Sequence, residues 1–321
     1  GSEMCIRDRH KIVNYFSKKY KKIGDDCAYL NKTKQLISTD SLVENKHFDL
    51  IHFSPLNIAH RLFLSNYSDI QSSGGLPKYV LLNISFPNKN FEFVKKIISN
   101  FHNLCLKYNV EIIGGDTTSS EKIFLSLTII SDSIEKKNII TRSKAKINDK
   151  VYTFSGIGFS KLGYLNLYKK FQLPKILTKL SINQFLKPKM YIYHDFFKDI
   201  EITSCMDLSD SLLSTLETIS SESKKKIIIN NLQPINPKLY NFLKKKNIYN
   251  SLILSSGEEY VPIFTSPIDL LYLNKKNQLK DRGIEIIHIG NIEKGKGVYL
   301  KNFNLNKVRK FDHFKNNYSL L

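Results

Sequence analysis

Apolar segments of strand length alternate with amphipathic helical segments along most of this 321-residue chain. Residues 79–86 are apolar and β-like between Pro77 and Pro87, whereas residues 91–108 carry their apolar side chains at helical spacing. Such alternation is typical of chains in which helices cover sheets, and it predicts an α/β fold with α+β layers. The chain length suggests about two domains, and we place their boundary near residue 140.

The same patterns predict the remaining elements. Strands are expected at residues 35–39, 110–113, 123–130, 150–154, 226–229, 260–264 and 285–289. Helices are expected at residues 10–20, 55–69, from about 160, at 182–196 and at 209–220. Residues 1–9 show no periodicity, and we expect them to be a non-native segment.

The formal net charge of +20 suggests nucleic-acid binding. The lysines are dispersed along the chain, however, and do not gather in one basic segment. Lys, Asn and Ile are abundant and have A/T-rich codons, so genome composition also accounts for the charge. We therefore rank a nucleic-acid-binding protein behind an enzyme, with the positive field steering anionic substrates.

The cysteines and the hydropathy pattern bear on the compartment. None of the four cysteines forms a C-x-x-C pair, so the sequence predicts neither a zinc site nor a disulfide framework. The apolar runs are far shorter than the about 20 residues that a membrane-spanning helix needs. No N-terminal segment has the pattern of a secretory signal, so a cytoplasmic protein without membrane contact is expected.

Aspartates at the ends of apolar segments are the strongest chemical signal in this basic sequence. They lie in Gly24-Asp25-Asp26, Ser38-Thr39-Asp40, Ser68-Asp69, Gly114-Gly115-Asp116 and Asp207-Leu208-Ser209-Asp210. Carboxylate oxygens are hard ligands that suit Mg²⁺, and several carboxylates do not stay ionised close together without a cation. If these motifs converge, a divalent metal and a phosphate are the natural complement.

Each motif also has an ordinary structural interpretation. Gly-Asp-Asp fits a turn, and the Gly114-Gly115 pair fits either a plain loop or a close approach of backbone to phosphate. Asp207–Asp210 fits a helix cap as well as a phosphate site. Residues 156–161 lack the spacing of a Walker A motif, and there is no G-x-S-x-G or protein-kinase signature.

Taken in order, eight motifs resemble the thiamine-monophosphate kinase family, within the superfamily of aminoimidazole ribonucleotide synthetase and selenophosphate synthetase. They are Ile23–Ala28, Ser38–Val43, His47-Phe48, Asn66–Ile70, Ile113–Thr118, Thr141–Ser143, Asp207–Asp210 and Ser256–Tyr260. The resemblance spans about residues 10–315. It implies ATP-dependent phosphorylation of thiamine monophosphate to thiamine diphosphate, by direct in-line transfer assisted by several Mg²⁺ ions.

The resemblance also implies an architecture and a set of residue roles. Residues 10–140 would form an ATP- and Mg²⁺-binding domain that shares a sheet or barrel with a partner in a homodimer, and residues 141–321 a C-terminal α/β domain. The metal ligands would be Asp26, Ser38, Thr39, Asp40, Asp69, Asp116, Asp207 and Asp210. The ATP-binding residues would be Gly115, Asp116, Arg142 and Ser209. Thiamine monophosphate would contact His47, Glu258 and Phe311. The catalytic residues would be Asp40, Asp116, Arg142 and Asp210.

Simpler roles stay open for some of these residues. His47 could equally be an ordinary surface histidine, and Arg142 could form a surface ion pair. Phe311 could pack in the hydrophobic core. Another ATP-dependent member of the superfamily is the alternative function. Selenophosphate synthetase would need a reactive cysteine near a glycine-rich N-terminal segment, and the hydrogenase-maturation protein a C-terminal cysteine; neither pattern is present.

The sequence departs from the family pattern at a few positions. Ser211 and Ser256 stand where glycine is usual, and Glu259 stands where aspartate is usual in Gly-Gly-Glu-Asp-Tyr; Leu76 and Lys144 also differ from the pattern. A Cβ atom is costly wherever φ must be positive, so Ser211 and Ser256 are expected to alter loop geometry. None of these departures removes a predicted metal ligand.

Overall fold

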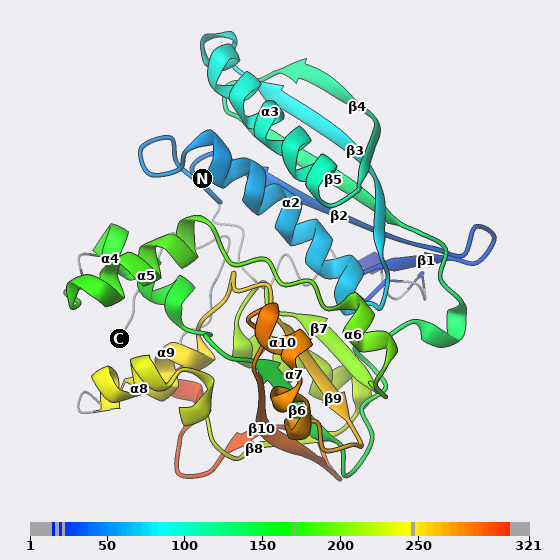
Figure 1. Ribbon diagram of the computed structural model, residues 1–321, viewed down its shortest axis with the longest axis vertical. Coiled ribbons are helices and arrows are strands. Elements are labelled where there is room, and N and C mark those ends of the chain that lie inside the picture. Colours follow the sequence, from blue (N-terminus) through cyan, green and yellow to red (C-terminus); the bar gives the residue numbers. More distant parts are fainter. Residues whose placement is uncertain (1–14, 17–18, 21–22, 170, 245–247, 309–321) are drawn as a thin grey trace. The chain divides into compact units, whose positions relative to one another are not determined.

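The computed structural model describes residues 15–16, 19–20, 23–169, 171–244 and 248–308 (Figure 1). They divide into two compact units. The N-terminal unit comprises Asp26–Ile139, and the C-terminal unit comprises the described residues from Ile140 onward together with those before Asp26. The helix expected at residues 10–20 lies largely outside the described residues, although Tyr15 and Phe16 are helical.

The N-terminal unit is a five-stranded sheet covered by two long helices. The strand order is β1-β2-β5-β3-β4, antiparallel except for the parallel β3–β4 pair. The strands are β1 (Ala28–Leu30), β2 (Gln35–Val43), β3 (Pro77–Phe86), β4 (Glu111–Ser119) and β5 (Phe124–Ser131). The helices are α2 (Pro55–Ser72) and α3 (Phe91–Lys107).

Helix α2 forms where the sequence predicts a helix. Ser54 caps its first turn, because the Ser54 hydroxyl accepts the Asn57 main-chain N–H at 3.2 Å while Pro55 occupies the first helical position. Its Ile58, Leu62 and Ile70 side chains are fully buried, and the helix packs on β2, β5 and α3. It carries Asp69 in its last turn and ends three residues beyond the predicted boundary.

Strand β4 is longer than expected, since it continues through Gly114-Gly115-Asp116 to Ser119. The plain-loop interpretation of this motif is therefore wrong. Parallel pairing with β3 brings the two backbones so close at Gly115 that a Cβ there would lie 1.9 Å from the Leu82 carbonyl oxygen. Glycine is compatible with such an approach inside a strand, and no local pattern signals the tertiary pairing that produces it.

The C-terminal unit is a six-stranded sheet in the order β11-β8-β10-β6-β9-β7, in which only the β11–β8 pair is parallel. The strands are β6 (Lys150–Phe154), β7 (Ser204–Asp207), β8 (Lys226–Ile229), β9 (Pro262–Ser266), β10 (Ile286–Glu293) and β11 (Gly297–Leu300). The helices are α4 (Phe159–Lys169), α5 (Lys175–Leu186), α6 (His194–Lys198), α7 (Leu212–Ser223), α8 (Pro237–Leu243), α9 (Tyr249–Leu254) and α10 (Asn277–Asp281).

The helix expected at residues 182–196 is wrong. Helix α5 ends at Leu186 and α6 begins only at His194, because Pro188 cannot continue a helix and restricts the residue before it. Helix α7 begins three residues later than predicted, since Ser211 caps it by accepting the Ser214 main-chain N–H at 3.2 Å. Strands β1, β7 and β11 and helices α8, α9 and α10 were not predicted. Within the described residues, no helix is both long and apolar enough to span a membrane.

Candidate active site

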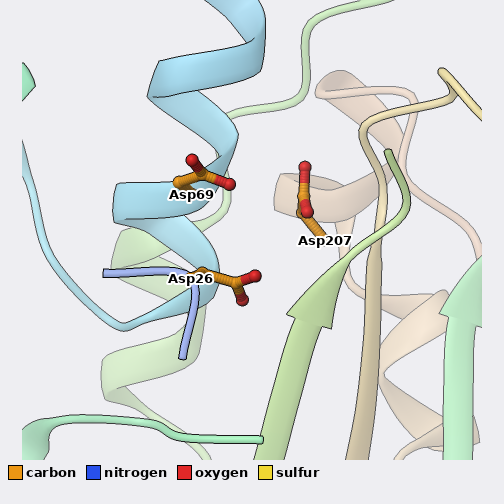
Figure 2. A group of neighbouring side chains, drawn as sticks. All are labelled: Asp26, Asp69 and Asp207. Carbon is orange, nitrogen blue, oxygen red and sulfur yellow. The ribbon is translucent and has the colours of Figure 1, made fainter. Parts of the chain in front are cut away.

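Two carboxylates and two hydroxyls gather in the N-terminal unit. An Asp26 carboxylate oxygen lies within 4.8 Å of one from Asp69. The Ser38 hydroxyl donates to Asp69 Oδ2 at 2.6 Å, and the Ser72 hydroxyl contacts Asp26 Oδ2 at 3.0 Å. Asp26 precedes β1 in the sequence, and Asp69 lies on helix α2 (Figure 2).

This donor set fits Mg²⁺ in its chemistry. Carboxylate and hydroxyl oxygens are hard ligands, and two half-buried carboxylates this close repel each other unless a cation or a proton lies between them. Within the described N-terminal unit, no third carboxylate lies close to both. Asp26, Ser38 and Asp69 thus form the part of the predicted ligand set that one unit brings together.

The neighbouring β2 residues differ in where their side chains point. Alternate residues of a strand face opposite sides of the sheet, and Ser38 and Asp40 share a side while Thr39 lies on the other. The Thr39 hydroxyl donates to the Leu127 carbonyl at 3.1 Å. The Asp40 main-chain N–H donates to Asn66 Oδ1 at 3.0 Å, which ties β2 to α2 beside Asp69.

Gly115 and Asp116 lie on the edge strand β4, where all nine residues are exposed. Asp116 Oδ1 accepts the main-chain N–H of Thr117 at 2.8 Å. His47 lies in the turn after β2, and its Nδ1 accepts the Val43 main-chain N–H at 3.0 Å. The neutral His47 ring therefore carries its proton on Nε2. Phe311 lies outside the described residues.

The C-terminal unit places Asp207 at the end of β7, where it is buried (Figure 2). The Ser209 hydroxyl donates to Asp207 Oδ1 at 3.2 Å, and the chain then passes through Asp210 into α7. Ser211 has a φ of −150°, so the departure from glycine at this position creates no backbone strain. Ser256 also lies outside the positive-φ region.

Both the backbone and the side chain of Arg142 form hydrogen bonds. Its main-chain N–H donates to Asp25 Oδ1 at 2.8 Å, and its carbonyl accepts the Ser204 and Ser223 hydroxyls at 2.9 and 3.1 Å. The guanidinium donates from one terminal nitrogen to the Gly24 carbonyl at 3.0 Å. Asp25, the first acid of the Gly-Asp-Asp motif, thus orders the arginine segment.

A pocket in the C-terminal unit contains two of the predicted residues, Asp210 and Glu258. It is lined by Ser160, Lys161, Tyr164, Phe185, Asp210, Ser255, Gly257 and Glu258. Burial lowers the pKa of Lys161 to about 8, although the Glu258 carboxylate opposes this shift. Burial and Glu258 together raise the pKa of Tyr164 to about 12. Cationic, anionic, hydroxyl and aromatic groups therefore meet in one small space.

The segment Ser255–Tyr260 is held against residues 208–210. The Glu258 main-chain N–H donates to the Ser209 carbonyl at 2.7 Å, and the N–H groups of Glu259 and Tyr260 donate to the Leu208 carbonyl. Glu258 and Tyr260 both have left-handed backbones, with φ values of 54° and 52°. Non-glycine residues hold such a conformation only where the surrounding structure enforces it.

The Glu259 carboxyl is removed from solvent, with 1% of the residue's surface exposed. Its Oε1 accepts the main-chain N–H groups of Gly158 and Ser160 at 2.7 and 3.0 Å. Burial raises its pKa to about 7, and hydrogen bonds from these groups, Ser256 and Gln184 limit the shift.

We expect Glu259 to make stability fall as pH rises from about 4.5 to about 7. Its pKa is raised from 4.5 in the unfolded chain to about 7 in the folded protein, so the protonated form is the one that folding favours. The contribution is fully present below pH 4.5 and lost above pH 7, and it amounts to about 3 kcal/mol. Urea unfolding at a series of pH values measures it as the difference between wild type and Glu259→Gln.

The exposed Glu285→Gln variant is the control, and its pH dependence should follow that of the wild type. Parallel curves for the wild type and Glu259→Gln between pH 4.5 and pH 8 would contradict the assignment.

Sequence reasoning located the acids but missed part of the pocket. Lys161 was noted only as the last residue of a segment that fails the Walker A pattern, and Tyr164, which also lines the pocket, was not noted. Gln184, which donates to Glu259, was not noted either. Glu259 was noted only as a departure from the family pattern. The sequence did contain a signal for the role of Glu259: two departures from the family pattern, Ser256 and Glu259, lie within four residues of each other.

Comparisons with known proteins identify the family. The model of the AIR synthase related protein N-terminal domain matches residues 24–131. A thiamine-monophosphate kinase from Leptospira interrogans is 34% identical over 252 residues, which are 77% of this chain and 79% of the relative. One from Buchnera aphidicola of Acyrthosiphon pisum is 33% identical over 284 residues, 84% of this chain and 86% of the relative.

Solved structures agree with these relatives and confirm the predicted fold class. A structure described as AaThiL complexed with AMPPCP and TMP matches with a TM-score of 0.79 and 25% identity, over 97% of both chains. The thiamine monophosphate kinase of Aquifex aeolicus matches in fold with a TM-score of 0.75, over 90% of this chain and 95% of that one. With relatives more than 30% identical across most of its length, this chain belongs to the thiamine-monophosphate kinase family.

Proposed function

We propose that this protein transfers the γ-phosphoryl group of ATP to thiamine monophosphate, which yields thiamine diphosphate and ADP. One observation carries the proposal: the fold matches over 97% of the chain that of a protein solved with AMPPCP, an ATP analogue, and TMP. The named relatives, of which this chain covers 79% and 86%, support the same reaction.

Mg²⁺ is the cofactor that the donor set supports. Asp26, Ser38 and Asp69 would hold one ion, since their oxygens already lie close together. Asp40 and Asp116 of the domain at residues 10–140, a Thr39 oxygen, and Asp207 and Asp210 of the domain at 141–321 would complete the ligand sets. When bound, Mg²⁺ supplies neutralising charge and orientation for the phosphates.

The chain's own residues position the two substrates. Gly115 would let the β4 backbone approach the ATP phosphates, and Ser209 and Arg142 would donate to phosphate oxygens, with the guanidinium stabilising the transferring charge. Glu258 and the His47 Nε2–H would contact thiamine monophosphate, with Phe311 beside it. The acceptor phosphate is already ionised at neutral pH, so no general base is required, and the transfer is direct and in line.

A homodimer is part of the proposal. Strand β4 is an edge strand whose nine residues are all exposed, and Ile112 and Ile113 are 39% and 49% exposed on it. An exposed apolar edge of this kind is suited to pairing with a second chain. Pairing of two such edges would produce the shared sheet that the resemblance implies.

The direct test incubates the purified protein with ATP, Mg²⁺ and thiamine monophosphate and detects thiamine diphosphate by chromatography. We expect product that requires Mg²⁺, and a loss on the order of 10³-fold in Asp40→Asn because a ligand to the phosphate-bound metal is removed. Thiamine without its phosphate is the acceptor control, and it should yield no diphosphate. A folded protein that binds ATP but makes no product would contradict the proposal and redirect the search to another acceptor.

A further inference from the structure

The carboxyl group of Glu259 connects three segments of the C-terminal unit. Besides the two main-chain donors before and within α4, Oε1 accepts the Ser256 hydroxyl at 2.7 Å. Oε2 accepts the Gln184 side-chain amide of α5 at 3.1 Å. Four hydrogen bonds thus end on one buried side chain.

These segments are the two walls of the pocket that holds Asp210 and Glu258. One wall is formed by the start of α4 and by α5, through Ser160, Lys161 and Phe185. The other wall is the Ser255–Tyr260 segment that presents Glu258. Glu259 belongs to the second wall by its backbone and reaches the first by its side chain, so its length and hydrogen bonds set how far apart the walls lie.

The two departures from the family pattern fit each other in this arrangement. Ser256 stands in place of glycine and supplies a hydroxyl donor, while Glu259 stands in place of aspartate and is one methylene longer. The Ser256 hydroxyl meets the Glu259 carboxylate directly, so neither residue is an isolated change. The expected distortion at Ser256 does not occur, because its φ is not positive.

We propose that Glu259 is a positioning residue that holds Glu258 opposite the α4 wall and thereby determines how thiamine monophosphate is bound. This inference rests on the proposed function. Loss of the Glu259 hydrogen bonds would allow the Ser255–Tyr260 wall to shift relative to α4 and α5, while its backbone bonds to Leu208 and Ser209 remain. We therefore expect the binding of thiamine monophosphate to weaken more than kcat falls. ATP contacts on β4 would not be affected.

A reciprocal exchange with Gln184 tests the inference. In Glu259→Gln the new amide faces the Gln184 amide, and in Gln184→Glu two carboxylates face each other. In the double variant Glu259→Gln/Gln184→Glu, donor and acceptor are exchanged and every bond can form again. Gln184 Oε1 also accepts the Lys189 main-chain N–H at 3.2 Å, and a glutamate at 184 can still do so.

We expect each single variant to raise KM for thiamine monophosphate about tenfold, with kcat and the KM for ATP changed less than about twofold. The double variant should return KM to within about twofold of the wild type. Ser256→Ala, which removes one donor only, should raise the same KM by a smaller factor. Glu285→Gln is the matched control and should leave all three constants unchanged.

The outcomes separate the inference from the function on which it rests. An active wild type whose single variants keep their KM values, or a folded double variant that remains as impaired as Glu259→Gln, overturns the role of Glu259 alone. If the single variants fail to fold but the double variant folds and is active, the result supports the role of Glu259. A wild type that forms no thiamine diphosphate overturns the proposed function and this inference with it.

Discussion

Asp69→Asn is expected to lower the rate of thiamine diphosphate formation on the order of 10³-fold at fixed Mg²⁺. Asp69 shares the proposed metal site with Asp26, and its carboxylate also accepts the Ser38 hydroxyl at 2.6 Å. The amide removes one negative charge from the ligand set, and a metal that stabilises transferring phosphoryl charge contributes several kcal/mol, which corresponds to that factor. Steady-state kinetics across a Mg²⁺ titration measure the loss and should show a raised metal requirement.

The matched control is Asp132→Asn, because Asp132 is an exposed aspartate of the same unit at the end of β5. It should retain wild-type rates and the same Mg²⁺ dependence. A wild-type Mg²⁺ titration in Asp69→Asn would exclude Asp69 as a ligand, even if the overall rate fell.

Gly257→Ala should destabilise the protein by about 3 kcal/mol or more and reduce kcat/KM for thiamine monophosphate on the order of 10²-fold. An alanine Cβ would lie 1.4 Å from the Asp210 carbonyl oxygen and 2.8 Å from that of Ser209. Both contacts are to backbone, so no side-chain rotation relieves them. The segment that carries Glu258 must therefore move away from residues 208–210. Chemical denaturation and steady-state kinetics measure the two effects.

Gly295→Ala separates this steric effect from the general cost of replacing glycine. Gly295 has a φ of 127°, but its added Cβ would meet only the Lys226 side chain, at 3.4 Å. We expect a loss of about 1 kcal/mol from backbone strain and unchanged kinetics. Equal losses of stability in the two variants, or full activity in Gly257→Ala, would show that the close approach to Asp210 is not required.

Much of the fold follows from short-range chemistry. Helix α2 begins at Pro55 because Ser54 caps it, and both residues can be read in the sequence. Strands β3 and β5 are flanked by proline or turn residues and form within a few residues of their predicted bounds. The split between α5 and α6 was missed, although Pro188 lies within the helix predicted there, because the apolar spacing alone continues past it.

In the candidate site, too, the sequence indicated some features and the tertiary structure decided others. The acids, Arg142 and Glu258 were predicted as site residues from the order of the motifs, which is a property of the sequence. The sequence did not indicate that Ser38 would contact Asp69 while Thr39 turned to the other face of β2, since both are small hydroxyl residues. Burial and strand register decided between them.

What the sequence determined by itself is therefore the family and the type and order of most of the longer elements, and it led us to propose the residues that carry the chemistry. These depend on periodicity, capping and motif order, which act within a few residues or survive as a linear pattern. Only the tertiary structure decided that β4 continues through its glycines, that Gly257 lies against Asp210, and that Glu259 joins α4 to α5. Each of these depends on a close approach between segments distant in the chain, where backbone atoms and buried hydrogen-bond donors must find partners.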